Sequence, residues 1–164
     1  MREAHIELLK QMPVFGGIRN DMLQFLLDRS PIVAVRRDEF FFREGDAAQS
    51  MFVLESGAVA ILKLWKGEQR LLRRLERGDC FGEMALMEMM SRSASVLAVE
   101  DCTAIELSVA SLFDLYEKDL EQFTLIQMNM GREVSRRLRV ADERLFTTMM
   151  ESSGIDPEHL PRST

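Results

Sequence analysis

Between residues 32 and 108, short apolar runs follow one another at close spacing, and glycine turns separate many of them. The runs are IVAV (32–35), FFF (40–42), MFVL (51–54), AVAILKLW (58–65), RLLRRL (70–75), ASVLAV (94–99) and TAIEL (103–107). The turn sequences are REGD (43–46), ESGA (55–58), KGE (66–68) and RGD (77–79). Short strands with glycine turns are typical of an antiparallel sandwich or barrel. We therefore expect a fold that is mainly β with flanking helices, in which a jelly-roll-like β-roll has about eight strands.

One of the turns predicts a specific strand pairing. The segment VLESGAVAI, residues 53–61, has apolar residues on both sides of Gly57. Glycine takes positive φ at little cost and is common in hairpin turns. We expect a hairpin here.

Helical periodicity flanks the β-rich segment on both sides. Residues 3–12 predict a short amphipathic helix that Pro13 ends, and residues 21–28 predict a second, with Asn20 as a possible N-cap. After Ser108 a short helix precedes a long one over about residues 121–151. The expected divisions are an N-terminal helical segment (1–31), the β-roll (32–110), C-terminal helices (111–151) and a flexible tail (152–164).

The long helix carries an apolar stripe along its whole length. Its members are Ile126, Met130, Val134, Leu138, Ala141, Leu145 and Met149. A helix of about 30 residues is about 45 Å long, which exceeds what so small a roll can cover. We therefore expect part of the stripe to meet a second copy of the chain, as a homodimer through this helix.

Composition and charge exclude several classes of protein. The hydrophobic content of 46% supports a core, the 29% of charged residues argues against disorder, and the net charge of −6 disfavours a general nucleic-acid binder. No apolar run could span a bilayer, and residues 1–12 lack the apolar segment of a secretory signal, so we expect a cytoplasmic protein with no membrane partner.

Neither the histidines nor the cysteines predict reactive chemistry. His5 and His159 lie near opposite ends of the sequence, so we expect no histidine-rich metal centre and no metal-dependent hydrolase. Cys80 and Cys102 sit among apolar neighbours without CxxC spacing. Buried free thiols are the expectation, with a disulfide or redox role as the alternative.

The segment FGEMALMEMMSRSASV, residues 81–96, combines a glycine, a carboxylate and an arginine with small and apolar residues. A short helical turn after Gly82 would present free backbone N–H groups, and Arg92 would add a guanidinium suited to phosphate. Glu83 would repel a phosphate but could accept from a sugar hydroxyl. Phosphate and ribose together describe a nucleotide. The alternative is that Glu83 and Arg92 form only a surface ion pair.

This segment resembles the phosphate-binding cassette of cyclic nucleotide-binding domains, the family of catabolite activator-like regulators and cAMP-dependent kinase regulatory subunits. Phe81-Gly82-Glu83-Met84-Ala85-Leu86 and Arg92-Ser93-Ala94-Ser95-Val96 match the pattern of that cassette. FFREGD (41–46), MFVLESGAVAI (51–61), LRRLERGDCFGE (72–83) and CTAIELS (102–108) are similar to the family's flanking segments. The resemblance covers about residues 10–146.

The resemblance implies a role for particular residues. Arg92 would pair with the cyclic phosphate, and Glu83 would take the ribose 2′-hydroxyl. Backbone amides or a hydroxyl would come from Gly82, Ala85, Ser93 and Ala94. Met84, ahead of Ile61 and Leu72, would touch the base or the sugar, and the alternative for each is a plain core residue. The ligand implied is cAMP, or cGMP, bound without turnover and without another cofactor.

Base choice depends on the long helix. Residues 133–145, EVSRRLRVADERL, resemble the helix that covers the base in the bacterial regulators, which commonly place hydroxyl side chains there. This chain has Ala141 and Asp142 at those places. Asp142 could accept from adenine or from guanine, or it could be a solvated residue. We expect cAMP ahead of cGMP, with ligand binding coupled to movement of this helix.

Three questions stay open in the sequence. About 18 residues follow Phe146, too few for a DNA-reading domain. We therefore expect no direct DNA binding. The chain would be either a stand-alone sensor or the sensor fragment of a longer transcription regulator. Arg136, Arg137 and Arg139 alternate with acidic residues and are expected to be a solvated helix face. A ligand-free interaction module of the same fold is an alternative function. A metal-binding cupin is disfavoured because the roll contains no histidines. The downstream protein is unknown.

Overall fold

The computed structural model describes residues 2–88 and 90–154, and its core is a β-roll of two four-stranded antiparallel sheets. One sheet has the order β1-β8-β3-β6 and the other β2-β7-β4-β5. The strands are β1 (Ile32–Val35), β2 (Phe40–Phe42), β3 (Ser50–Ser56), β4 (Val59–Trp65), β5 (Glu68–Leu75), β6 (Cys80–Phe81), β7 (Ser95–Ala98) and β8 (Cys102–Ser108). The predicted roll, flanking helices and long C-terminal helix are confirmed.

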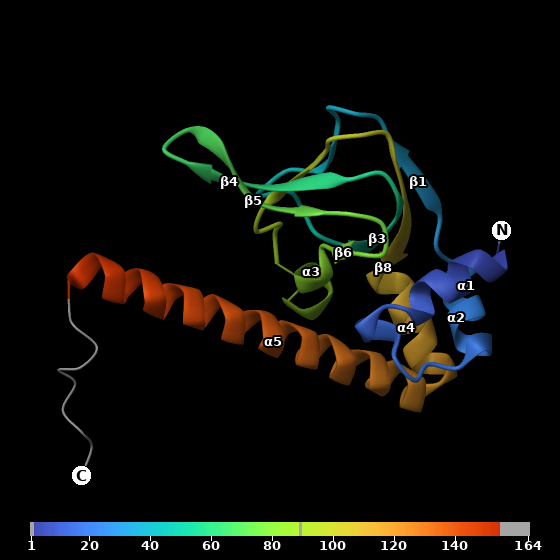
Figure 1. Ribbon diagram of the computed structural model, residues 1–164. Coiled ribbons are helices and arrows are strands. Elements are labelled where there is room, and N and C mark those ends of the chain that lie inside the picture. Colours follow the sequence, from blue (N-terminus) through green and yellow to red (C-terminus); the bar gives the residue numbers. More distant parts are fainter. Residues whose placement is uncertain (1, 89, 155–164) are drawn as a thin grey trace, which may run out of the picture.

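The helices are α1 (Arg2–Lys10), the 3-10 helix η1 (Pro13–Phe15), α2 (Asn20–Leu27), α4 (Val109–Lys118) and α5 (Leu120–Ser153), while α3 (Glu83–Glu88) lies within the roll's connections. Helices α1, α2 and α4 and the start of α5 lie together at one end of the roll, and α5 then runs past α3 and away from this group (Figure 1). Arg19, and not Asn20, is the N-cap of α2, and it makes no side-chain cap. The predicted tail began at residue 152, but Ser152 and Ser153 belong to α5 and Gly154 is its C-cap; the part of the predicted tail from residue 155 onward lies outside the described residues.

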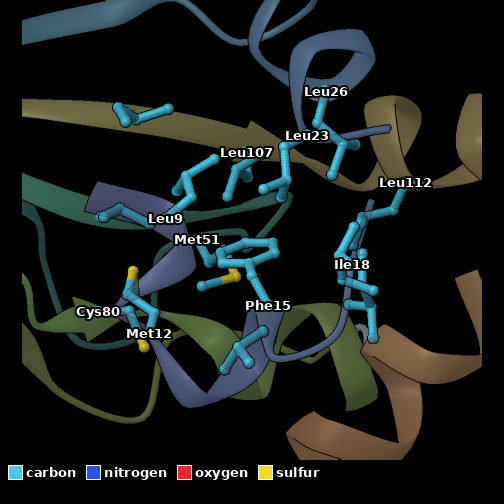
Figure 2. Packing of buried hydrophobic residues seen from close by; sticks show 14 of the residues in the cluster. Leu9, Met12, Phe15, Ile18, Leu23, Leu26, Met51, Cys80, Leu107 and Leu112 are labelled. Atoms are coloured by element: carbon cyan, nitrogen blue, oxygen red, sulfur yellow. The ribbon is translucent and has the colours of Figure 1, made fainter. Parts of the chain in front are cut away.

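Strand β3 is buried on both faces, which divides the interior into two cores. Met51 and Val53 pack with the helices, in a cluster that includes Phe15, Leu23 and Leu107 (Figure 2). Phe52 and Leu54, on the alternate positions, pack between the two sheets with other apolar side chains. Because side chains alternate across a strand, one strand supplies both cores.

The hairpin predicted at Gly57 is wrong, although its turn is present. Gly57 has a φ of 84°, and a Cβ there would lie 2.5 Å from the carbonyl oxygen of Asp101, so the position needs glycine. The strands on either side do not pair with each other. β3 pairs with β6 and β8, whereas β4 pairs with β5 and β7. The turn therefore carries the chain from one sheet to the other.

Helix α5 is 34 residues long and leaves the roll part-way along its length (Figure 1). Its first turns are anchored, because Ile126 and Met130 are buried in the helical cluster and the Asn129 amide donates to the carbonyl oxygens of Val14 and Gly16. Farther along, Leu138 and Leu145 are each 60% exposed. The predicted stripe is therefore buried at its start and open towards its end. Within the described residues, no helix is long and apolar enough to cross a membrane.

Candidate functional site

The cassette segment, residues 81–96, runs from β6 through Gly82 and α3 to β7. Gly82 has a φ of 80°, and a Cβ on it would lie 2.7 Å from the Nη1 atom of Arg92. No side chain fits there without displacing the guanidinium. Glycine at this position therefore lets the backbone approach Arg92.

Arg92 is a buried cation that the protein satisfies only in part. Its side chain lies over the ring of Phe42, with 3.9 Å from the guanidinium carbon to the ring centroid, and its Nη1 donates to the carbonyl oxygen of Ser50 at 2.7 Å. Its Nε is buried without a hydrogen-bond partner in the described part of the chain. Burial lowers the pKa of Arg92 from its ordinary value, opposed by the charges of Glu106 and Asp46. An arginine stays charged in proteins, so the site keeps a positive charge with a spare donor.

Arg92 lines a cavity of about 80 Å³, which we call the inner cavity. This volume holds several water molecules, or a group of phosphate size. The predicted ligand-binding residues that line it are Ile61, Gly82, Glu83, Met84, Arg92, Ser93 and Ala94. The structure therefore brings together residues that the sequence separates by up to 33 positions (Ile61 to Ala94).

A second hollow, the outer groove, has a volume of about 880 Å³ and lies between β5, α3 and α5. The predicted residues Leu72, Glu83 and Met84 line it, together with Ala141 of α5. Arg73, Glu83 and Met84 line both hollows, so the two share a wall. A ligand with a small anionic end and a larger flat end would fit this pair of spaces.

Two predicted residues stand apart from the rest. Asp142 is exposed and lines neither hollow, because the next residue on a helix is rotated by about 100° from its neighbour and Ala141 takes the position on the groove. Leu72 is 64% exposed and lines only the outer groove. Ala85 lies in α3, but its side chain is outside the described residues.

Glu83 is buried at 4% exposure and forms an ion pair with Arg137 of α5. The surface pair between Glu83 and Arg92 that the sequence left open is absent from the described contacts, since both side chains are buried and Glu83 faces another arginine. Arg137 also lies 3.7 Å from a carboxylate oxygen of Glu133, one helical turn earlier. The acid of the cassette is thus held by the long helix.

Sequence reasoning missed Arg137 and Arg73. Arg137 was expected on a solvated face, but its side chain is only 29% exposed. It also lies near Cys80: burial raises the pKa of the Cys80 thiol, and the positive charge of Arg137 partly opposes that rise. Glu133 lies four residues before Arg137, which is the spacing of a helical ion pair, but Arg136 also pairs with Glu133, so this spacing does not single out Arg137. The side chain of Arg73 of β5 makes no ion pair or hydrogen bond with any described residue, and its pattern of exposed neighbours gave no signal.

The comparison with known families decides what this arrangement is. A family model described as the cyclic nucleotide-binding domain matches residues 32–119, which contain the whole roll and the cassette. The chain belongs to the cyclic nucleotide-binding domain family. The resemblance of the cassette segment is thereby confirmed at the level of the family. Residues 32–119 include Gly82, Glu83 and Arg92, which line the inner cavity together.

Named relatives of this domain differ in the nucleotide they are called after. The chain is 30% identical over 146 residues to the cyclic AMP receptor protein of Thermus thermophilus, covering 88% of this chain and 66% of that protein. It is 26% identical to human cGMP-dependent protein kinase 2 over 82% of this chain and 18% of the kinase. The crystal structure of the Thermus thermophilus catabolite activator protein superposes with a TM-score of 0.75 at 29% identity, covering 85% of this chain and 64% of that one. This cyclic nucleotide-binding domain therefore spans less than two thirds of these relatives.

Both cysteines of the domain, Cys80 and Cys102, are buried free thiols, as the sequence predicted. Among residues 2–88 and 90–154, no group of three or more His, Cys, Asp or Glu side chains is arranged to hold a metal ion.

Proposed function

We propose that this chain is a regulatory sensor that binds a cyclic nucleotide without turning it over, with cAMP ahead of cGMP. The observation that carries the proposal is the buried guanidinium of Arg92, which has an unpartnered Nε and lines the inner cavity beside Gly82 and Glu83. The cyclic phosphate occupies the inner cavity, the ribose hydroxyl lies at Glu83, and the base extends into the outer groove. A charge-assisted hydrogen bond contributes about 1.5–3 kcal/mol net, so the sugar and base contacts supply the rest of a micromolar affinity.

The preference for cAMP rests on the 30% identity to a cyclic AMP receptor protein. cGMP is the second candidate, and one feature favours it. Arg73 is a guanidinium without a partner among the described residues, and it lines both hollows. Guanine offers two adjacent acceptors, O6 and N7, to an arginine, whereas adenine offers N7 beside a donor.

The signal leaves the site through α5. Glu83 is the residue proposed to accept from the ribose, and it is also the partner of Arg137 on α5. A ligand at Glu83 changes the environment of that ion pair, and so biases the position of the helix by its differential affinity for the two arrangements. The exposed apolar residues beyond Leu138 form the surface through which two copies pair, and an unidentified downstream protein reads the change.

The test is calorimetric titration with cAMP, cGMP and a cyclic dinucleotide side by side. We expect binding of a cyclic mononucleotide and no response to the dinucleotide, because the inner cavity has room for one phosphate. Hydrogen exchange over residues 120–150 with and without saturating nucleotide then tests the coupling. The absence of heat with every nucleotide would favour a ligand-free interaction module of the same fold, and identical exchange in both states would refute the coupling.

A further inference from the structure

Two exposed methionines, Met84 and Met90, line the proposed nucleotide site. Of the 12 methionines in the chain, several are buried in the helical cluster, among them Met12, Met51 and Met130. Others are open to solvent, and three of these fall within one short stretch: Met84 is 44% exposed, Met87 42% and Met90 65%. The thioether is a soft, reactive group whose oxidation follows exposure.

The exposed methionines differ in what they face. Met84 and Met90 line the inner cavity together with Arg92, and Met84 also lines the outer groove. Met87 has nearly the same exposure as Met84 but lines neither hollow. Met128 and Met149 of α5 are about half exposed and also lie outside both linings. The chain therefore contains its own matched controls for an effect confined to the site.

We propose that Met84 and Met90 are an oxidative modification site that controls access of the nucleotide, a proposal that rests on the function proposed above. Hydrogen peroxide transfers one oxygen atom to the thioether sulfur: the peroxide O–O bond breaks, an S–O bond forms, the sulfur is oxidised and water is released. The product is a sulfoxide, which is polar and can be reduced again by methionine sulfoxide reductases.

The sulfoxide acts on the site in two ways. Its oxygen is a strong hydrogen-bond acceptor, and it competes with the phosphate for the guanidinium groups of Arg92 and Arg73, which line the inner cavity with both methionines. Oxidation also replaces an apolar thioether side chain by a polar sulfoxide where the base and sugar of the nucleotide would make contact. Both effects weaken binding of an anionic nucleotide.

The experiment uses the full chain, treated with hydrogen peroxide in the presence and absence of cAMP, followed by peptide mass mapping. Without nucleotide, all the exposed methionines should gain oxygen faster than Met12, Met51 and Met130. With nucleotide, only Met84 and Met90 should be protected, while Met87, Met128 and Met149 react as before. Equal protection of all the exposed methionines, or of none, would overturn the assignment.

Titration of the oxidised protein gives the functional readout. We expect its dissociation constant for cAMP to rise by about tenfold or more, with recovery after reductase treatment. Met84→Leu/Met90→Leu keeps side chains of similar volume that cannot be oxidised, so its own dissociation constant should be the same before and after peroxide. Met87→Leu should lose affinity on oxidation as the natural chain does. Single Met84→Leu and Met90→Leu variants repeat the test if the double variant fails to fold.

Two failures are distinguishable in this design. If the untreated chain binds neither cAMP nor cGMP, the proposed function fails and the modification site falls with it. If the untreated chain binds and the fully oxidised chain binds equally well, the sensor function stands and the modification site alone is refuted. The modification site alone would also be refuted if the Met84→Leu/Met90→Leu variant lost as much affinity on oxidation as the natural chain does.

Discussion

Glu83 of α3 and Arg137 of α5 form an ion pair that joins residues 54 positions apart. The carboxylate is buried, and the guanidinium is the one group of the long helix that reaches it among the described contacts. The acid proposed to hold the ribose is therefore also the acid that holds the helix. This shared use is the physical basis of the predictions on coupling.

Removing the guanidinium of Arg92 should weaken nucleotide binding most. We expect Arg92→Ala to reduce the affinity for cAMP by about 2–5 kcal/mol, because an enclosed phosphate would lose its charged partner. Calorimetry measures the change. Arg74→Ala is the matched control, since Arg74 is exposed on β5, pairs with Glu100 and lines neither hollow. An unchanged dissociation constant for Arg92→Ala would refute the assignment.

Comparing alanine substitutions at Gly82 and Gly78 distinguishes the effect of backbone strain from the effect of displacing Arg92. Gly78 has a φ of 90° with nothing within 4 Å of an added Cβ, so Gly78→Ala should cost about 1–2 kcal/mol from backbone strain alone. Gly82→Ala carries the same strain and also forces the guanidinium to move. It should be less stable than Gly78→Ala by urea unfolding and should lose nucleotide binding as well. Equal affinities in the two variants would show that the position of Arg92 is unimportant.

Breaking the pair with α5 should loosen that helix. We expect Arg137→Ala to lower the free energy of unfolding by about 1–3 kcal/mol, because it leaves the buried Glu83 without its partner. Hydrogen exchange should rise in residues 120–150. The neighbouring Arg136→Ala removes an exposed pair with Glu133 and should cost less than about 1 kcal/mol. Comparable effects of the two substitutions would mean that the Glu83 contact adds nothing.

Base discrimination should depend on Arg73 and be indifferent to Asp142. Arg73→Ala should reduce the affinity for cGMP more than that for cAMP, because only guanine offers two acceptors to the guanidinium. Asp142→Ala should leave both affinities unchanged, since Asp142 lines neither hollow. Competition titration with the two nucleotides measures the ratio. A ratio that moves with Asp142 and not with Arg73 would reverse these roles.

The open end of the α5 stripe should mediate pairing of two copies. Leu145→Glu places a charge on the exposed apolar face and should convert a dimer to a monomer, as measured by light scattering after size-exclusion chromatography. Thr147→Glu adds the same charge two residues along, on the opposite side of the helix, and should leave the dimer intact. A monomeric natural chain would rule out this interface.

The sequence was sufficient wherever one segment contained the whole signal. Apolar runs and glycine turns predicted the roll, and the resemblance of residues 81–96 to the cassette pattern implied that Gly82, Glu83 and Arg92 meet at one site. What depended on distant partners was missed. The two-residue strand β6 is too short to show a period, β3 pairs with β6 and β8 and not with the adjacent β4, and Arg137 has the same local pattern as its solvated neighbours. Only the path of α5 over the cassette distinguishes these arginines.

The doubly buried strand β3 has a consequence for how the molecule can fail. Its carbonyl at Ser50 receives the hydrogen bond from Arg92, and the next residue, Met51, packs in the same cluster as Met130 of α5. Neither core can melt without exposing the other face of this strand. Heating should therefore abolish ligand binding and the anchoring of α5 in a single cooperative step. We expect no intermediate in which the nucleotide site is still folded while α5 has detached.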